Sequence, residues 1–140
     1  MSLPLATGIP PKSVTSILRV EGATVFIAML ATYQLLGGNW WLFALLILAP
    51  DLSMIGFAGG EKRGAQVYNV VHTYTAPLVL AAIAWLAGFP ALLPLAVIWA
   101  AHIGADRAIG YGLKYPESFK VTHLGAMGRM KKAQQVADPT

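Results

Sequence analysis

Two histidines and three carboxylates lie inside apolar stretches of this sequence. His102 and Asp106 are four residues apart, so they share one face of a helix, while His72, Asp51 and Glu21 lie in other stretches. Imidazole and carboxylate ligands suit a divalent transition metal such as zinc, iron or manganese, and an open coordination position can activate water. We therefore predict His72, His102 and Asp106 as metal ligands. Asp51 and Glu21 are the catalytic candidates, each as a general base or a further ligand.

The same residues also fit two other interpretations. Arg19 and Arg107 could neutralise the carboxylates while the histidines donate to carboxylate or backbone oxygens, which would make a structural polar network. Alternatively, the ionisable groups could form a proton or ion path. Asn69 lies on the helical face of His72 and belongs to the same candidate polar site. The residue types alone leave these alternatives open.

Several other chemistries are excluded by composition and motif. The chain has no cysteine, so it has no disulfide, thiolate metal site or cysteine nucleophile. It has no glycine-rich phosphate loop, no Gly-x-Ser-x-Gly elbow and no His-Glu-x-x-His motif. Its basic residues do not form a stripe with interleaved aromatic residues, so nucleic acid is not an expected partner.

The elements that carry these residues have the composition of membrane helices. The 140 residues are 56% hydrophobic and 11% charged, with a mean hydropathy of +0.61, whereas a soluble domain has about a quarter charged residues. So apolar a chain would not stay disordered in water. Four stretches reach the length of about 20 residues that a membrane crossing needs. They are Ile17–Leu36, Asn39–Ala58, Gln66–Ala87 and Pro90–Tyr111.

The connections and the charges predict how these stretches are arranged. Gly37-Gly38 and residues 88–90 are short enough only for tight antiparallel helical hairpins, and residues 59–64 form a polar, exposed turn. All ten Lys and Arg residues then fall on one side, which places both termini in the cytoplasm. We predict an all-α bundle of four transmembrane helices built from two hairpins.

Depth in the membrane brings the polar residues together. At 1.5 Å of rise per residue, Glu21, Asp51, His72, His102 and Asp106 all lie about 6–12 Å from the cytoplasmic ends of their helices. Ionisable groups at such depth seldom face lipid, so we expect them to meet inside the bundle. The proline before Asp51 is expected to kink its helix and to free a backbone carbonyl.

The chain after the last stretch divides into two parts. Residues 110–125 mix aromatic and basic side chains, as in an interfacial segment that lies on lipid headgroups, and this segment could bring His123 within reach of the polar layer. From Arg129 onward the sequence is polar. We therefore predict one membrane-embedded domain over residues 1–128 and a polar tail over residues 129–140.

Four separated motifs resemble those of a small bacterial membrane family, the domain of unknown function 4260. The resemblance covers about residues 18–125 and is carried by Ala-Pro-Asp-Leu-Ser-Met at 49–54, Tyr-Asn-x-x-His-Thr-Tyr at 68–74, Ala-His-Ile-Gly-x-Asp-Arg at 101–107 and Gly-Tyr-Gly-Leu-Lys-Tyr-Pro at 110–116. It implies a four-helix, multi-pass protein of the bacterial inner membrane with a shared polar constellation, and it brings no activity with it. In plan the chain is also similar to membrane-bound metal-dependent hydrolases, whose motifs differ.

These observations lead to three functional hypotheses. The first is a metal-dependent hydrolase-like enzyme that acts on a lipid-like substrate from the cytoplasmic leaflet, with Arg19 or Arg107 holding an anionic headgroup. The second is a membrane scaffold or accessory subunit whose polar network is structural and which binds membrane lipids, a second copy of itself or another membrane protein. The third is a proton-coupled carrier, which would require a dimer.

Overall fold

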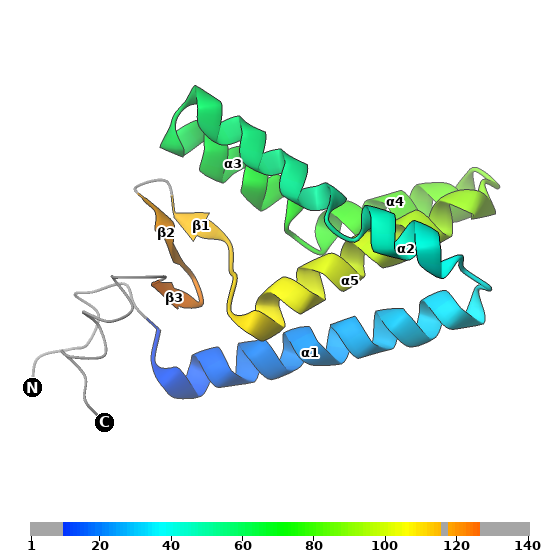
Figure 1. Ribbon diagram of the computed structural model, residues 1–140, viewed down its shortest axis with the longest axis horizontal. Coiled ribbons are helices and arrows are strands. Elements are labelled where there is room, and N and C mark those ends of the chain that lie inside the picture. Colours follow the sequence, from blue (N-terminus) through cyan, green and yellow to red (C-terminus); the bar gives the residue numbers. More distant parts are fainter. Residues whose placement is uncertain (1–9, 116–117, 127–140) are drawn as a thin grey trace, which may run out of the picture.

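The computed structural model describes residues 10–115 and 118–126 (Figure 1). The described part of the chain is predominantly helical, with α-helices interspersed with stretches of 3-10 helix (η). The helices in chain order are α1 (Lys12–Leu35), α2 (Trp40–Leu46), η2 (Ala49–Gly59), α3 (Glu61–Val71), α4 (Thr75–Leu86), η3 (Pro90–Leu92) and α5 (Leu93–Ile109). Three strands follow, β1 (Lys114–Tyr115), β2 (Ser118–Thr122) and β3 (Gly125–Ala126).

Several helices of the described chain are long and apolar enough to cross a membrane. Three qualify directly, namely Lys12–Leu35, Trp40–Gly59 and Pro90–Ile109. The helices α3 and α4 are together long and apolar enough for a fourth span, although the pair is bent by 44° at the break between them. Large apolar side chains such as Leu35, Trp41 and Leu86 are exposed on these segments, as expected of residues that face lipid. These features agree with the predicted membrane protein.

Two helix breaks lie next to candidate site residues. The α-helical hydrogen bonding of α2 stops at Leu46, and the chain continues as the 3-10 helix η2 with Pro50 in its first turn. Proline has no N–H to donate, so the α-helix cannot continue through it, and the kink predicted here is a change of helix type. The second break follows Val71, where residues 72–74 separate α3 from α4.

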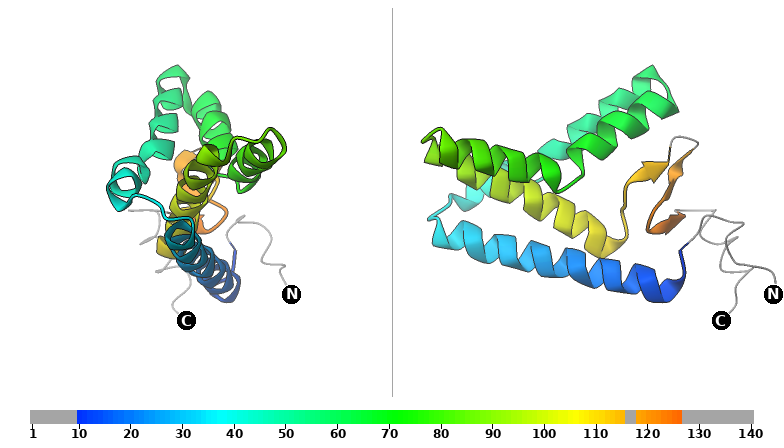
Figure 2. Two further views of the ribbon diagram at one scale, coloured as in Figure 1. Left: turned by 90° about the vertical axis from the view of Figure 1, so that its right-hand side faces the viewer. Right: turned by 180° about the vertical axis from the view of Figure 1, so that it is seen from behind.

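The helices pack in an order that differs from their order in the sequence. α1 lies along α5, α3 lies along η2, and α4 contacts α5 (Figures 1 and 2). The contact between α1 and α5 is close because glycine meets glycine there. A Cβ atom built on Gly22 would lie 2.8 Å from the backbone oxygen of Gly104. Small residues of this kind let membrane helices approach each other closely.

The segment after α5 contains three short strands that were not predicted from the sequence. They lie in the part of the chain that was predicted to be interfacial and form an antiparallel sheet in the order β1-β2-β3. Lys114 pairs with Thr122, and Val121 pairs with Ala126. Gly110 ends α5 in the left-handed conformation, with φ of 102°, which turns the chain back. The strands lie in the opening between α3 and α5, and β1 contacts α3 (Figure 1). The predicted polar tail, residues 129–140, lies outside the described residues.

Candidate metal centre

Four of the predicted side chains converge on one point, namely Asp51, His72, His102 and Asp106, which we call the four-residue group. One ligand atom from each lies within 4.8 Å of the others. The two histidine Nε2 atoms are 3.2 Å apart. Oδ1 of Asp51 lies 3.5 Å from Nε2 of His72 and 3.3 Å from Nε2 of His102. Oδ2 of Asp106 lies 3.6 Å and 3.2 Å from the same two nitrogens.

Three separate elements deliver these side chains. Asp51 follows Pro50 in the first turn of η2, and His72 is the residue at which α3 ends. His102 and Asp106 lie one turn apart on α5, as the spacing of four residues predicts. The group therefore joins the two helix breaks to a continuous helix, and none of the three elements could form it alone.

Backbone carbonyls hold both imidazole rings through their outer nitrogens. Nδ1 of His72 lies 2.9 Å from the carbonyl oxygen of Tyr68, and Nδ1 of His102 lies 2.6 Å from that of Ile47. A carbonyl oxygen only accepts hydrogen bonds, so each Nδ1 is the donor. In a neutral histidine this leaves the lone pair of Nε2 facing the centre of the group. Metal-binding histidines are usually held by such a hydrogen bond from the other ring nitrogen.

Burial makes the group closed on one side and open at Asp51. The side chains of His72 and His102 are 1% and 4% exposed, that of Asp106 is 15% exposed, and that of Asp51 is 40% exposed. The two imidazoles and the carboxylate of Asp106 are therefore largely enclosed by protein, while the carboxylate of Asp51 is accessible from outside. A small molecule would reach the group past Asp51.

A layer of buried side chains supports His72. The ring of Tyr68 stacks on the imidazole with 3.7 Å between centroids and 10° between planes. Nζ of Lys114 lies 4.6 Å from the centroid of the Tyr68 ring, in a cation–π contact. Arg107 Nη2 donates to the carbonyl oxygen of His72 at 3.0 Å. The stacking of Tyr68 fixes the ring plane of His72, and the hydrogen bond from Arg107 fixes its backbone.

Asn69 attaches the small sheet to this layer. Its side-chain Nδ2 donates to the carbonyl oxygen of Lys114 at 2.8 Å, and its Oδ1 accepts from the Lys114 N–H at 2.7 Å. Burial lowers the pKa of the Lys114 ammonium below its usual value, and the nearby carboxylates of Asp106 and Asp51 offset only part of this shift. The sheet thus places a cation within the electrostatic reach of both carboxylates.

Asn69 and Arg107 support the four-residue group without belonging to it, and three further predicted site residues lie outside both the group and the layer that supports it. Glu21 is exposed on α1 and is not among its members. Arg19 Nε donates to the carbonyl oxygen of Ala108 at 2.9 Å, near the end of α5. His123 Nδ1 accepts from the Leu113 N–H at 2.9 Å, and burial together with Arg107 lowers the pKa of His123.

Two supporting residues were missed at the sequence level. Tyr68 is four residues before His72, a spacing that places both on one helical face, so periodicity alone could have included it. Lys114 is far from the group in sequence and reaches it only because the chain turns back after Gly110. No local pattern carries that information.

Five of the distances between ligand atoms in the group are compatible with a bound metal ion. A tetrahedral ion with ligands at about 2.0–2.2 Å places its ligand atoms about 3.3–3.6 Å apart. The five distances given above span 3.2–3.6 Å. Since one ligand atom of each residue also lies within 4.8 Å of the others, the group could hold an ion.

Comparison with known families places the chain. Residues 15–127 match the family described as a domain of unknown function, DUF4260. The chain belongs to this family. The matched region contains the whole four-residue group and the residues that support it. No curated protein and no solved structure matches the DUF4260 chain.

Proposed function

We propose that this DUF4260 protein is an integral membrane protein with a transition-metal centre, and that the centre hydrolyses a lipid-like substrate. The observation that carries the proposal is the convergence of four ligand atoms from Asp51, His72, His102 and Asp106 within 4.8 Å of one another. Zinc, iron and manganese all accept such a set of imidazole and carboxylate ligands.

The hydrogen bonds around the group favour a cation at its centre. Because each histidine Nδ1 faces a carbonyl oxygen, a neutral ring turns an acceptor toward the two carboxylates. Four acceptors then lie within 4.8 Å of one another, and three of their side chains are at most 15% exposed, which is unfavourable unless a positive charge lies between them. A metal ion supplies that charge and binds every acceptor at once.

Burial suggests how the work is divided among the four residues. His72, His102 and Asp106 are the more deeply buried members and are the permanent ligands in this proposal. Asp51, with 40% of its side chain exposed, is the general base or a displaceable fourth ligand. A bound ion would lower the pKa of its water toward neutrality and so provide a nucleophile for hydrolysis.

The proposed placement has four membrane crossings, with α3 and α4 forming one bent crossing. Both termini lie in the cytoplasm, and the membrane is the bacterial inner membrane. This is supported by the basic residues, which all lie toward one side of such an arrangement. The group then lies beneath the cytoplasmic surface, where lipid headgroups and water can both reach Asp51.

Metal analysis tests the proposal directly. Wild-type protein purified without chelator should contain about one Zn, Fe or Mn per chain, as expected of a single site. Asp106→Asn should lose most of this metal because a charged, buried ligand becomes neutral. Glu21→Gln is the matched control, since it makes the same chemical change at an exposed residue outside the group, and it should keep the metal.

A structural polar network without metal is the second candidate. The nitrogen–oxygen distances of 3.2–3.6 Å between the histidines and the carboxylates also suit ion pairs between imidazolium and carboxylate. In that case wild-type protein would contain no stoichiometric metal, and chelator would leave its thermal unfolding in detergent unchanged. A metal centre predicts the opposite result, because an ion that binds only the folded state stabilises it and its removal lowers Tm. X-ray absorption should then find N and O ligands at about 2.0–2.2 Å.

A further inference from the structure

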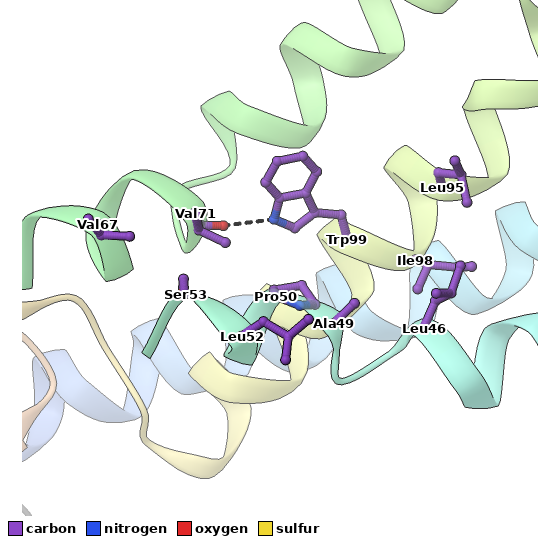
Figure 3. A pocket seen from close by; sticks show the side chains of 10 residues that line it. All are labelled: Leu46, Ala49, Pro50, Leu52, Ser53, Val67, Val71, Leu95, Ile98 and Trp99. Carbon is purple, nitrogen blue, oxygen red and sulfur yellow. Dashed lines mark hydrogen bonds between the residues drawn. The ribbon is translucent and has the colours of Figure 1, made fainter. Parts of the chain in front are cut away.

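An apolar pocket of about 550 Å³ lies beside the four-residue group (Figure 3). It is bordered by α2 and η2 on one side and by α3 and α5 on the other, and its volume is within the range of small-molecule sites. The residues that define its extent are Leu46, Pro50, Ser53, Val67, Leu95 and Trp99.

The lining suits hydrocarbon. No charged side chain lines the pocket, and all but two of its lining residues are aliphatic. The indole N–H of Trp99 is already used, since it donates to the carbonyl oxygen of Val71 at 2.7 Å (Figure 3). The hydroxyl of Ser53 is buried and has no hydrogen-bond partner within the described residues. A polar headgroup would therefore find few partners here, whereas an aliphatic chain would contact the lining everywhere.

The pocket opens toward the lipid-facing side of the protein. Among its lining residues, Leu52 is 68% exposed and Val67 is 44% exposed. Both lie on segments that are proposed to cross the membrane. The molecules that surround such a rim are membrane lipids, and they can enter the pocket sideways without passing through water.

The pocket also adjoins the four-residue group at three places. Asp51 lies between the lining residues Pro50 and Leu52, and His72 directly follows the lining residue Val71. On α5, Ile98 lines the pocket one turn before His102. An acyl chain that fills the pocket would thus pass beside the group.

The direction of the pocket matches that of a lipid in the cytoplasmic leaflet. Leu95 lies seven residues before His102 on α5, which is about 10 Å farther from the proposed cytoplasmic end of that helix. Leu46 borders the pocket on the opposite side, before the break at Pro50. Toward the middle of the proposed bilayer the lining thus continues beyond the group, in the direction of the acyl chain of such a lipid, while Val67, five residues before His72 on α3, extends it on the cytoplasmic side.

We propose that this pocket holds one acyl chain of a membrane phospholipid, with the polar end of the chain at the four-residue group. The position of the polar end rests on the function proposed above, whereas occupation of the pocket by the chain does not. The substrate class is accordingly a phospholipid whose hydrolysable ester lies at the junction of pocket and group.

Photocrosslinking tests the proposal. The full-length protein is reconstituted in vesicles that contain phosphatidylethanolamine with a photoactivatable group in one acyl chain, and labelled peptides are mapped by mass spectrometry. Peptides that contain Leu46–Ser53 and Leu95–Trp99 should be labelled several-fold more strongly than the exposed Leu78 region of α4. Equal labelling of all three would overturn the proposal, because it would mean ordinary contact with bulk lipid.

A matched pair of variants tests whether the acyl chain lies in the pocket. Ala49→Trp fills the pocket from η2 and should reduce its labelling to the level of α4. Ala58→Trp makes the same change on the same element, at an exposed residue that does not line the pocket, and should preserve the labelling. If Ala49→Trp does not fold, Val67→Trp offers a second exposed site on the rim. Retained pocket labelling in the folded variant contradicts the proposal.

The two proposals can fail separately. Pocket labelling in a wild-type protein that lacks metal would leave a lipid site and refute the metal centre. Stoichiometric metal without pocket labelling would leave the metal centre and refute the lipid site. Labelling by a photoactivatable free fatty acid, but not by the phospholipid, would overturn the phospholipid assignment.

Discussion

Asp51 is the most exposed member of the four-residue group. Its side chain is 40% exposed, compared with 15% for Asp106, although both carboxylates approach the same two imidazoles. It also borders the apolar pocket through its sequence neighbours. An exposed carboxylate beside an apolar pocket can exchange partners, whereas a more deeply buried one is held by its surroundings.

The substitution Asp51→Asn should separate metal binding from hydrolysis. We expect the variant to keep its metal on His72, His102 and Asp106, while hydrolysis of a fluorogenic phospholipid ester falls at least about 100-fold, as is typical when a general base is lost. Metal content and initial rates are measured on the same preparation. Loss of the metal would instead identify Asp51 as an essential ligand, and an unchanged rate would remove it from the mechanism.

Interruptions in the helices are what place two members of the group. Asp51 and His72 each lie at a point where an α-helix is interrupted. The change to η2 near Pro50 and the break after Val71 allow both side chains to point toward α5. Broken helices in membrane proteins are tolerated where their freed backbone groups find partners. Here the carbonyls of Ile47 and His72 accept from His102 and Arg107.

Close contact between α1 and α5 supports the helix that carries His102 and Asp106. A Cβ atom on Gly22 would lie 2.8 Å from two backbone atoms of α5, Ala108 N and Gly104 O, which cannot rotate away. Overpacking by Gly22→Ala should therefore destabilise the protein by about 1–3 kcal/mol. The higher helix propensity of alanine should offset at most about 1 kcal/mol of this loss. Thermal unfolding in detergent measures the difference.

Gly59→Ala is the control for this prediction. It adds the same methyl group, but the nearest atom is Arg63 Cδ at 3.4 Å, which is ordinary contact with a flexible side chain. We expect its Tm to equal that of the wild type. Equal Tm values for the two variants would show that the helices separate without cost, and the close packing of α1 on α5 would not be important for stability.

At the scale of the whole molecule, α1 and α5 form one pair while η2 and α3 form another, and the strands fill the opening between α3 and α5 (Figures 1 and 2). The four-residue group lies where η2, α3 and α5 meet. Residues from the sheet reach the same place, since Lys114 contacts Tyr68 and Asn69. The sheet therefore packs against the residues of α3 that support His72.

Membrane topology can be tested with single cysteines because the chain has none of its own. We expect Leu36→Cys and Ala87→Cys to react with a membrane-impermeant maleimide in intact spheroplasts, and Lys62→Cys to react only after the membrane is permeabilised. All three residues are exposed. If residue 87 instead behaves like residue 62, then α3 and α4 form a re-entrant loop, and the protein has three crossings.

The sequence by itself determined the class of protein and the candidates for its site. Hydropathy showed stretches long enough to cross a membrane, and the fixed rise of a helix placed the histidines and carboxylates at similar depth. The spacing of His102 and Asp106 was enough to put both on one face. These properties depend only on the chain near each residue, so they can be derived without a fold.

Only the tertiary structure decided which of the candidates meet. Glu21 was predicted to lie in the same polar layer as Asp51, yet α1 approaches α5 through Gly22 and leaves Glu21 exposed, while the break at Pro50 directs Asp51 toward the two histidines. The contact of Lys114 with Tyr68 and the apolar pocket likewise join elements that are distant in sequence. Helix periodicity fixes the face on which a residue lies, but which faces pack together depends on the shapes of all the helices at once.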